Sequence, residues 1–92
     1  MAAVAANAIA TGQATMTGAA IAVAPARADR KRLTLVMGGT PADTFIGGPG
    51  VGVGTGVLLA GVKGQTIVLE TTAAVFGNGT AAAVVTYIEE FA

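Results

Sequence analysis

The chain has 92 residues, of which 53% are hydrophobic and only 11% charged, and its five basic and five acidic side chains cancel. It contains no cysteine, histidine or tryptophan, and no serine occurs along the sequence. These absences exclude disulfides, thiol and serine nucleophiles, histidine acid–base catalysis and the usual zinc or haem ligand sets. We therefore expect a protein that is not an enzyme and has no catalytic residue, no cofactor and no metal site.

The apolar content is mostly alanine and valine, which bury little surface per residue. A chain this short already buries a small fraction of its surface, and natural domains of this size compensate with disulfides, a metal or oligomerisation. Because disulfides are excluded and metal ligands are scarce, we expect the chain to associate with other copies or with a larger protein.

Residues 1–26 carry no charge and are rich in alanine, threonine and glycine. The segment lacks the run of large aliphatic residues that drives membrane insertion, and no basic residue precedes it as in a secretory signal, so we expect no membrane role. Thr15, Thr17, Ile21 and Val23 alternate as in a strand. We predict an extended low-complexity arm over residues 1–26 that orders by pairing with a neighbouring strand edge; a disordered tail is the alternative.

Four of the five basic residues fall between Arg27 and Arg32. They indicate either contact with an anionic partner or a solvated strand entry whose charges block edge pairing. No aromatic residues are interleaved and the net charge is zero, so we expect no nucleic-acid partner. Our candidate partner-binding residues come from the arm and from this cluster: Thr15, Thr17, Ile21, Val23, Arg27, Arg30 and Arg32.

A compact β domain is predicted over residues 27–92, and it begins with a strand that places Leu33, Leu35 and Met37 on one face. Further strands are expected at 43–46, 57–60, 66–71, 71–76 and 80–91, with Asn78-Gly79 as a type I′ hairpin turn. The fold class is therefore all-β, a small antiparallel β-sandwich or barrel with an extended N-terminal arm. The expected core residues are Leu33, Leu35, Phe45, Ile67, Leu69, Val85 and Tyr87.

Glycine recurs at every second position from Gly50 to Gly56. The spacing matches neither the dinucleotide-binding fingerprint nor the phosphate-binding loop, which needs Gly-Lys followed by Ser or Thr. Glycine also permits close backbone approach. We expect a flexible or closely packed surface loop, or alternatively a loop that lies flat on a neighbouring subunit.

The β region resembles small tailed-phage virion proteins, which are capsid decoration-like β modules. The shared order is a basic strand entry, an L-x-L strand, an I-G pair, a G-hydrophobic-L-L segment and an A-A-V-aromatic strand. In this sequence it lies in Arg27–Leu35, Gly39-Thr40, Thr44–Gly47, Gly56–Leu59, Gly64–Ile67 and Thr71–Phe76. The resemblance spans residues 27–91 and implies a structural protein with no catalytic residue.

Size, composition and this resemblance together predict a virion structural protein on the outer capsid surface of a phage. It would decorate or cement the capsid through contacts with the major capsid protein, as a homo-oligomer with a trimer favoured. The alternative is a module on a phage tail or head fibre that binds a host-surface glycan. That function would require exposed aromatic platforms, and the chain has only three phenylalanines and one tyrosine.

Overall fold

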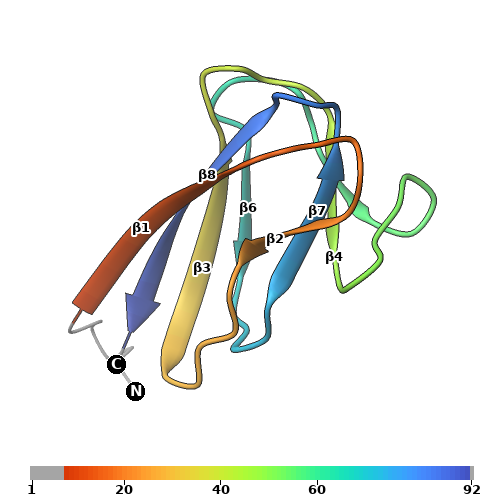
Figure 1. Ribbon diagram of the computed structural model, residues 1–92. Coiled ribbons are helices and arrows are strands. Elements are labelled where there is room, and N and C mark those ends of the chain that lie inside the picture. The colour runs from red at the N-terminus through yellow and green to blue at the C-terminus, as the bar shows by residue number, and fades with distance from the viewer. Residues whose placement is uncertain (1–7, 92) are drawn as a thin grey trace.

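The computed structural model describes residues 8–91, which form eight strands in two antiparallel four-stranded sheets (Figure 1). Sheet A has the order β1-β8-β3-β6 and sheet B the order β2-β7-β4-β5. The strands are β1 (Ala8–Thr15), β2 (Ile21–Ala24), β3 (Arg30–Met37), β4 (Thr44–Gly47), β5 (Val57–Leu59), β6 (Thr66–Leu69), β7 (Val75–Gly79) and β8 (Val84–Phe91).

Every connection except the one between β4 and β5 crosses from one sheet to the other. This strand order is that of a jelly roll, an eight-stranded sandwich built from two Greek keys. The predicted all-β class with antiparallel sheets is confirmed. In residues 8–91 no helix is long and apolar enough to cross a membrane.

The core lies between the two sheets and is built from medium-sized side chains. Leu33, Leu35 and Met37 of β3 face inward, as their alternation predicts, and pack with Val85 of β8. The rest of the buried cluster comes from both sheets and their connections: Met16, Val23, Ala24, Ile46, Leu59, Val75 and Ala83. Ile67, Leu69 and Tyr87 are half-buried and pack against this cluster.

Two local predictions differ from the structure. Phe45 was expected in the core, but Thr44 and Ile46 are the buried residues of β4, and Phe45 is only half-buried on the outer side of sheet B. Asn78-Gly79 was expected to form a hairpin turn, but both residues belong to β7. A Cβ on Gly79 would overlap the Thr44 side chain of the neighbouring strand β4 and lie 3.0 Å from the side chain of Met16, so close packing on both sides requires glycine there.

The chain turns between β7 and β8 at Thr80–Ala83, where the Ala83 amide donates to the Thr80 carbonyl (3.1 Å). Ala82 has a φ of 74°, in the left-handed region that glycine normally occupies. Ala82 and Ala83 together oppose Met16, whose amide donates to Ala83 and whose carbonyl accepts from Ala82. This is a β-bulge at the start of β8.

The N-terminal segment is extended, but from Ala8 onward it belongs to the sandwich. β1 pairs with β8, and β2 pairs with β7 across a register shift between Ala22 and Ala24. The boundary expected at residue 26 therefore differs from the structure, because residues 8–24 find their partner strands within the chain. Residues 1–7 of the predicted arm lie outside the residues that the structure describes.

Candidate functional site: surface recesses and the Arg30 clasp

The arm residues predicted to bind a partner divide into two groups. Thr15 and Thr17 are exposed, at the end of β1 and in the turn that follows it. Val23 is only 5% exposed and belongs to the core, and Ile21 is half-buried against it. Ile21 and Val23 are thus occupied within the domain, which leaves Thr15 and Thr17 as surface residues.

Arg30 is 3% exposed and its guanidinium is engaged entirely within the molecule. Its Nη1 donates to Glu89 Oε2 (2.8 Å) and to the Pro25 carbonyl (2.8 Å). Its Nε donates to the Thr71 carbonyl (2.9 Å) and its Nη2 to the Ala73 carbonyl (2.6 Å). The side chain joins the β2–β3 connection, the β6–β7 connection and β8, and we call this group the Arg30 clasp.

The other two arginines predicted to bind a partner also lie near carboxylates. Arg27 Nε is 3.4 Å from Glu89 Oε2, and Arg32 Nη1 is 3.8 Å from Glu90 Oε1 on the outer face of sheet A. The Arg27 amide also donates to the Thr72 carbonyl (2.9 Å). Local carboxylates therefore offset the positive charge of the cluster, which weakens its attraction for an anionic partner.

The exposed candidates do not form one contact surface. Thr15 lies opposite Val84 at the start of β8, whereas Arg32 lies opposite Glu90 near its end. At about 3.4 Å per residue, the two positions are separated by about 20 Å along the sheet.

An apolar cleft of about 370 Å³ opens between the two sheets on the β5–β6 side. Ile67 and Leu69 line it from β6, and Val57 stands in its mouth with 66% of its surface exposed. The remaining lining residues are small or apolar and come from the β4 end and the β6–β7 connection: Ile46, Gly47, Gly48, Thr71, Ala73, Ala74 and Val75. The cleft offers apolar area and carries no ionisable side chain.

A second recess, of about 290 Å³, lies on the outer side of sheet B. Phe45 forms its aromatic wall, with Asp43, Asn78 and Thr80 supplying polar groups. Asp43 Oδ1 accepts from the Gly61 amide (2.7 Å), and the Asn78 side-chain amide donates to the Val51 carbonyl (3.1 Å). These two bonds fix both side chains at the rim and leave Asp43 Oδ2 and Asn78 Oδ1 as further acceptors.

The alternating glycines form an ordered loop beside this recess. Val51 is buried, and a Cβ on Gly56 or Gly47 would lie within 3 Å of its Cγ2 atom. Gly50, which follows Pro49, has a φ of 76° and allows the chain to turn there. The loop packs on its own sheet, in agreement with the expected closely packed surface loop, and carries Val53 exposed at 71%.

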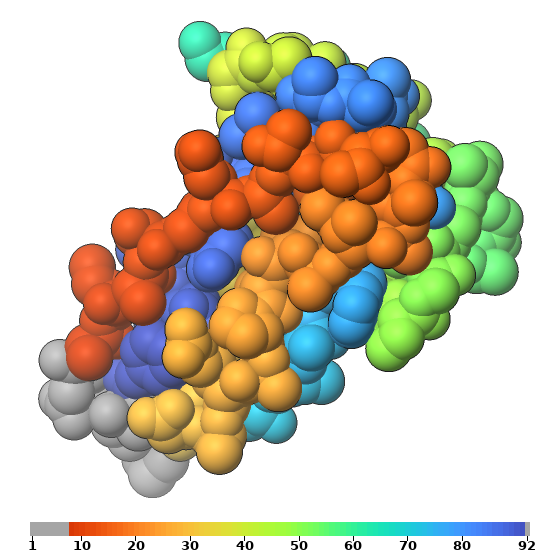
Figure 2. Space-filling model, in the orientation of Figure 1, coloured from red at the N-terminus to blue at the C-terminus, as the bar shows by residue number. Residues whose placement is uncertain are grey.

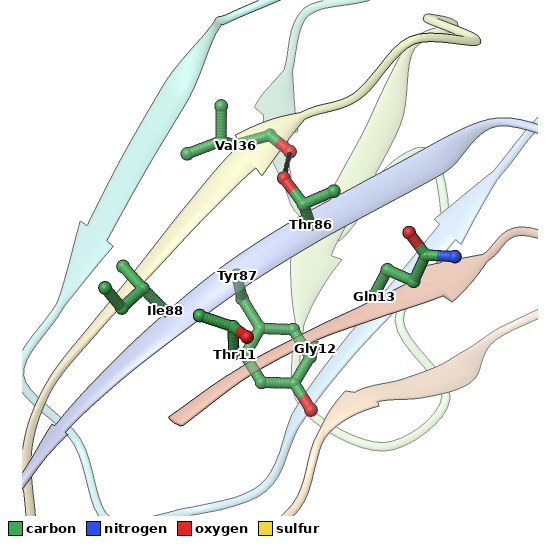
Figure 3. Close-up of a pocket in the computed structure, with 7 residues that line it drawn as sticks. All are labelled: Thr11, Gly12, Gln13, Val36, Thr86, Tyr87 and Ile88. Atoms are coloured by element: carbon green, nitrogen blue, oxygen red, sulfur yellow. Dashed lines mark hydrogen bonds between the residues drawn. The ribbon is translucent and has the colours of Figure 1, made fainter. Parts of the chain in front are cut away.

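A shallow depression on the outer face of sheet A is lined by uncharged residues of three neighbouring strands, β1, β8 and β3 (Figure 3). Thr11 and Gln13 of β1 flank it on one side, and Val36 of β3 lies on the other. The Thr86 hydroxyl donates to the Val36 carbonyl (3.0 Å). Tyr87 passes beneath Gly12, and a Cβ on that glycine would overlap its ring.

Within residues 8–91, no three Asp or Glu side chains gather in a group that could hold a metal ion. Comparison of the chain with protein-family models, with curated proteins and with solved structures finds no match.

Proposed function

We propose that this chain is a non-enzymatic structural protein that decorates the outer capsid surface of a phage and binds its major capsid protein as a homo-oligomer. The observation that carries the proposal is the open apolar cleft between the sheets, with Val57 in its mouth. Concave, mostly apolar sites of about this volume are where proteins commonly take up ligand or partner groups. The small core and the resemblance of residues 27–91 to capsid decoration-like modules support the same role.

The chemistry of the cleft defines what it would accept. An apolar side chain from the capsid surface would contact Val57, Ile67 and Leu69 and would meet no charge. Attachment would then depend on buried apolar area, and salt would weaken it little, because screening acts mainly on exposed charges.

The test is the binding of purified chain to capsids that lack it, with cryo-electron microscopy of the loaded particles. Val57→Asp places a carboxylate in the cleft mouth and should lower occupancy at least about tenfold, because the charge must be desolvated on binding. Val62→Asp is the matched control, since Val62 is 61% exposed but lines neither the cleft nor the recess beside Phe45. Equal occupancy for the two variants would overturn the use of the cleft.

The same binding experiment at high salt provides a second test. At about 0.5 M salt the Debye length falls to a few Å, and we expect the bound chain to remain on the particle. Release under these conditions would instead identify exposed charges such as Arg27 and Arg32 as the main contact.

A second candidate function is binding of a host-surface glycan, and the recess beside Phe45 favours it. An aromatic wall with Asp43, Asn78 and Thr80 around it offers stacking area together with acceptors and a donor for sugar hydroxyls. Binding to a glycan array that is abolished by Phe45→Ala would support this candidate, with Phe76→Ala as the control for loss of a half-buried aromatic residue outside the recess. Cryo-electron microscopy separates the two functions, because decoration predicts many copies on the shell and a fibre module predicts few copies on an appendage.

A further inference from the structure

The four edge strands of the sandwich are protected to very different degrees. β5 has three residues and β6 four, and Lys63 and Glu70 flank β6. β2 also has four residues, contains the register shift at Ala22/Ala24 and is followed by Pro25. Short strands, bulges, proline and nearby charges all discourage edge-to-edge pairing.

β1 has none of these protections. It is eight residues long, carries no charge and no proline, and pairs with β8 in an unbroken register. Among the described elements β8 is its only neighbour in sheet A, and β1 runs along the margin of the molecule in Figure 2. A long, uncharged edge that no described strand covers is a template for another strand.

The backbone groups that face this open edge follow from the ladder. Met16 directs both its amide and its carbonyl toward the β7–β8 hairpin. In an antiparallel ladder both groups of every second residue point to the same side, so Ala14, Gly12 and Ala10 also face β8. The amides and carbonyls of Ile9, Thr11, Gln13 and Thr15 therefore point away from β8, toward the open edge.

These four residues are complementary to a second copy of themselves. In an antiparallel pair centred on Gly12, Thr11 lies opposite Gln13 of the other copy and Ile9 lies opposite Thr15. Each residue then donates and accepts across the junction. The facing side chains are uncharged, and Gly12 meets Gly12 at the axis, so no like charges or bulky groups oppose the pairing.

We infer that the open edge of β1 binds β1 of a second copy of this chain, which joins two A sheets into one continuous sheet around a two-fold axis at Gly12. This inference goes beyond the proposed function, because it concerns how two copies meet whether or not they lie on a capsid. Pairing of identical antiparallel edges closes with two copies. It therefore predicts a dimer as the closed unit, in place of the trimer that the sequence analysis favours.

Disulfide cross-linking tests both the pairing and its register, because the chain has no cysteine of its own. Thr11 and Gln13 are exposed, so Thr11→Cys and Gln13→Cys leave the core untouched. Hydrogen-bonded cross-strand residues have Cα atoms about 5.5 Å apart, within disulfide reach. Identical positions are diagonal neighbours about 7–8 Å apart, which is beyond it.

We expect an equimolar mixture of Thr11→Cys and Gln13→Cys chains to oxidise mainly to the mixed disulfide, at least about tenfold over either self-linked species. The control pairs each variant with Val68→Cys, an exposed position on the short β6 edge, and should give no such excess. Mixed disulfide no more abundant than in this control would overturn the inference.

The unmodified chain supplies an independent measurement. Its mass in solution should approach twice 8.9 kDa as concentration rises, and Gln13→Pro should hold it at the monomer mass. Proline at that position removes an amide that points away from β8 and has no partner among residues 8–91, so the fold is retained. Tyr87, the single tyrosine in a chain without tryptophan, lies beneath Gly12, and its fluorescence should change along with the mass. A monomer at every concentration, or a trimer, would contradict the pairing.

These results are separable from those on the capsid. If the chain is a dimer and its Val57→Asp variant binds particles normally, the pairing of β1 edges stands and the proposed use of the cleft is rejected. If occupancy on particles depends on Val57 but no mixed disulfide forms, the pairing of β1 edges is rejected and the proposed function stands.

Discussion

β1 and β2 come from one uncharged, low-complexity segment, yet the sandwich holds them in different ways. β2 sends Val23 and Ala24 into the core, and the Arg30 clasp bonds the Pro25 carbonyl directly after it. β1 contributes only small residues to the inner face, Ala10, Gly12 and Ala14, and is attached mainly through its ladder with β8. The difference shows that one uncharged, low-complexity segment can yield a strand whose side chains enter the core and a strand that is attached mainly by backbone pairing.

The largest expected effect concerns the clasp. Arg30→Met keeps much of the side-chain volume but leaves Glu89 buried without its hydrogen-bonded partner, and should lower the free energy of unfolding by about 3–5 kcal/mol. Urea denaturation measures it. Arg32→Met, which removes the exposed ion pair with Glu90, should cost about 0–1 kcal/mol. Equal losses of unfolding free energy for the two variants would show that the Arg30 clasp does not hold the segment after β2 in place.

The second effect concerns the close contact that holds β1. Gly12→Val places a branched side chain where the Tyr87 ring lies and should cost about 1–3 kcal/mol by overpacking. Thr11→Val, on the exposed side of the same strand, should stay within about 0.5 kcal/mol of the unmodified chain. In a Tyr87→Ala background the cost of Gly12→Val should fall, and an unchanged cost would exclude Tyr87 as the cause.

The smallest effect concerns the β-bulge at Ala82 and Ala83, which precedes β8 and lies opposite Met16, the residue that follows β1. Ala82→Gly relieves the left-handed backbone at φ 74° and should raise the free energy of unfolding by about 1 kcal/mol. Ala81→Gly is the control, because Ala81 does not have a positive φ, and added chain entropy should destabilise it slightly. Thermal unfolding distinguishes the two, and a loss of stability in Ala82→Gly would show that the turn is not strained.

The sequence predicts those parts of the molecule in which the local pattern decides the structure. The inward face of β3 follows from simple alternation, and so does the all-β class. Phe45 was misplaced because hydrophobicity outweighed the register that buries Thr44 and Ile46. Asn78-Gly79 was misread because glycine also serves close packing, and the turn falls on Thr80–Ala83, where alanine carries the positive φ.

The surface sites were largely beyond the sequence. Arg30 appears as one charge among four, and only the fold brings Pro25, Thr71, Ala73 and Glu89 around it. The apolar cleft depends on how far the two sheets separate beside β5 and β6, which no local pattern encodes. The recess beside Phe45 joins residues more than thirty positions apart. The absence of charge over residues 8–15 was visible at once, but its meaning depends on β1 lying at an edge.

Amide hydrogen exchange along β1, read residue by residue by NMR, tests most directly whether this edge is covered by a second copy. In the Gln13→Pro monomer the Thr11 and Thr15 amides should exchange quickly, while those of Ala10 and Gly12, bonded to β8, remain slow. In the concentrated unmodified chain Thr11, Gln13 and Thr15 should become as protected as Ala10 and Gly12. Fast exchange at Thr11 and Gln13 at every concentration would contradict the account, because the edge would then have no strand against it.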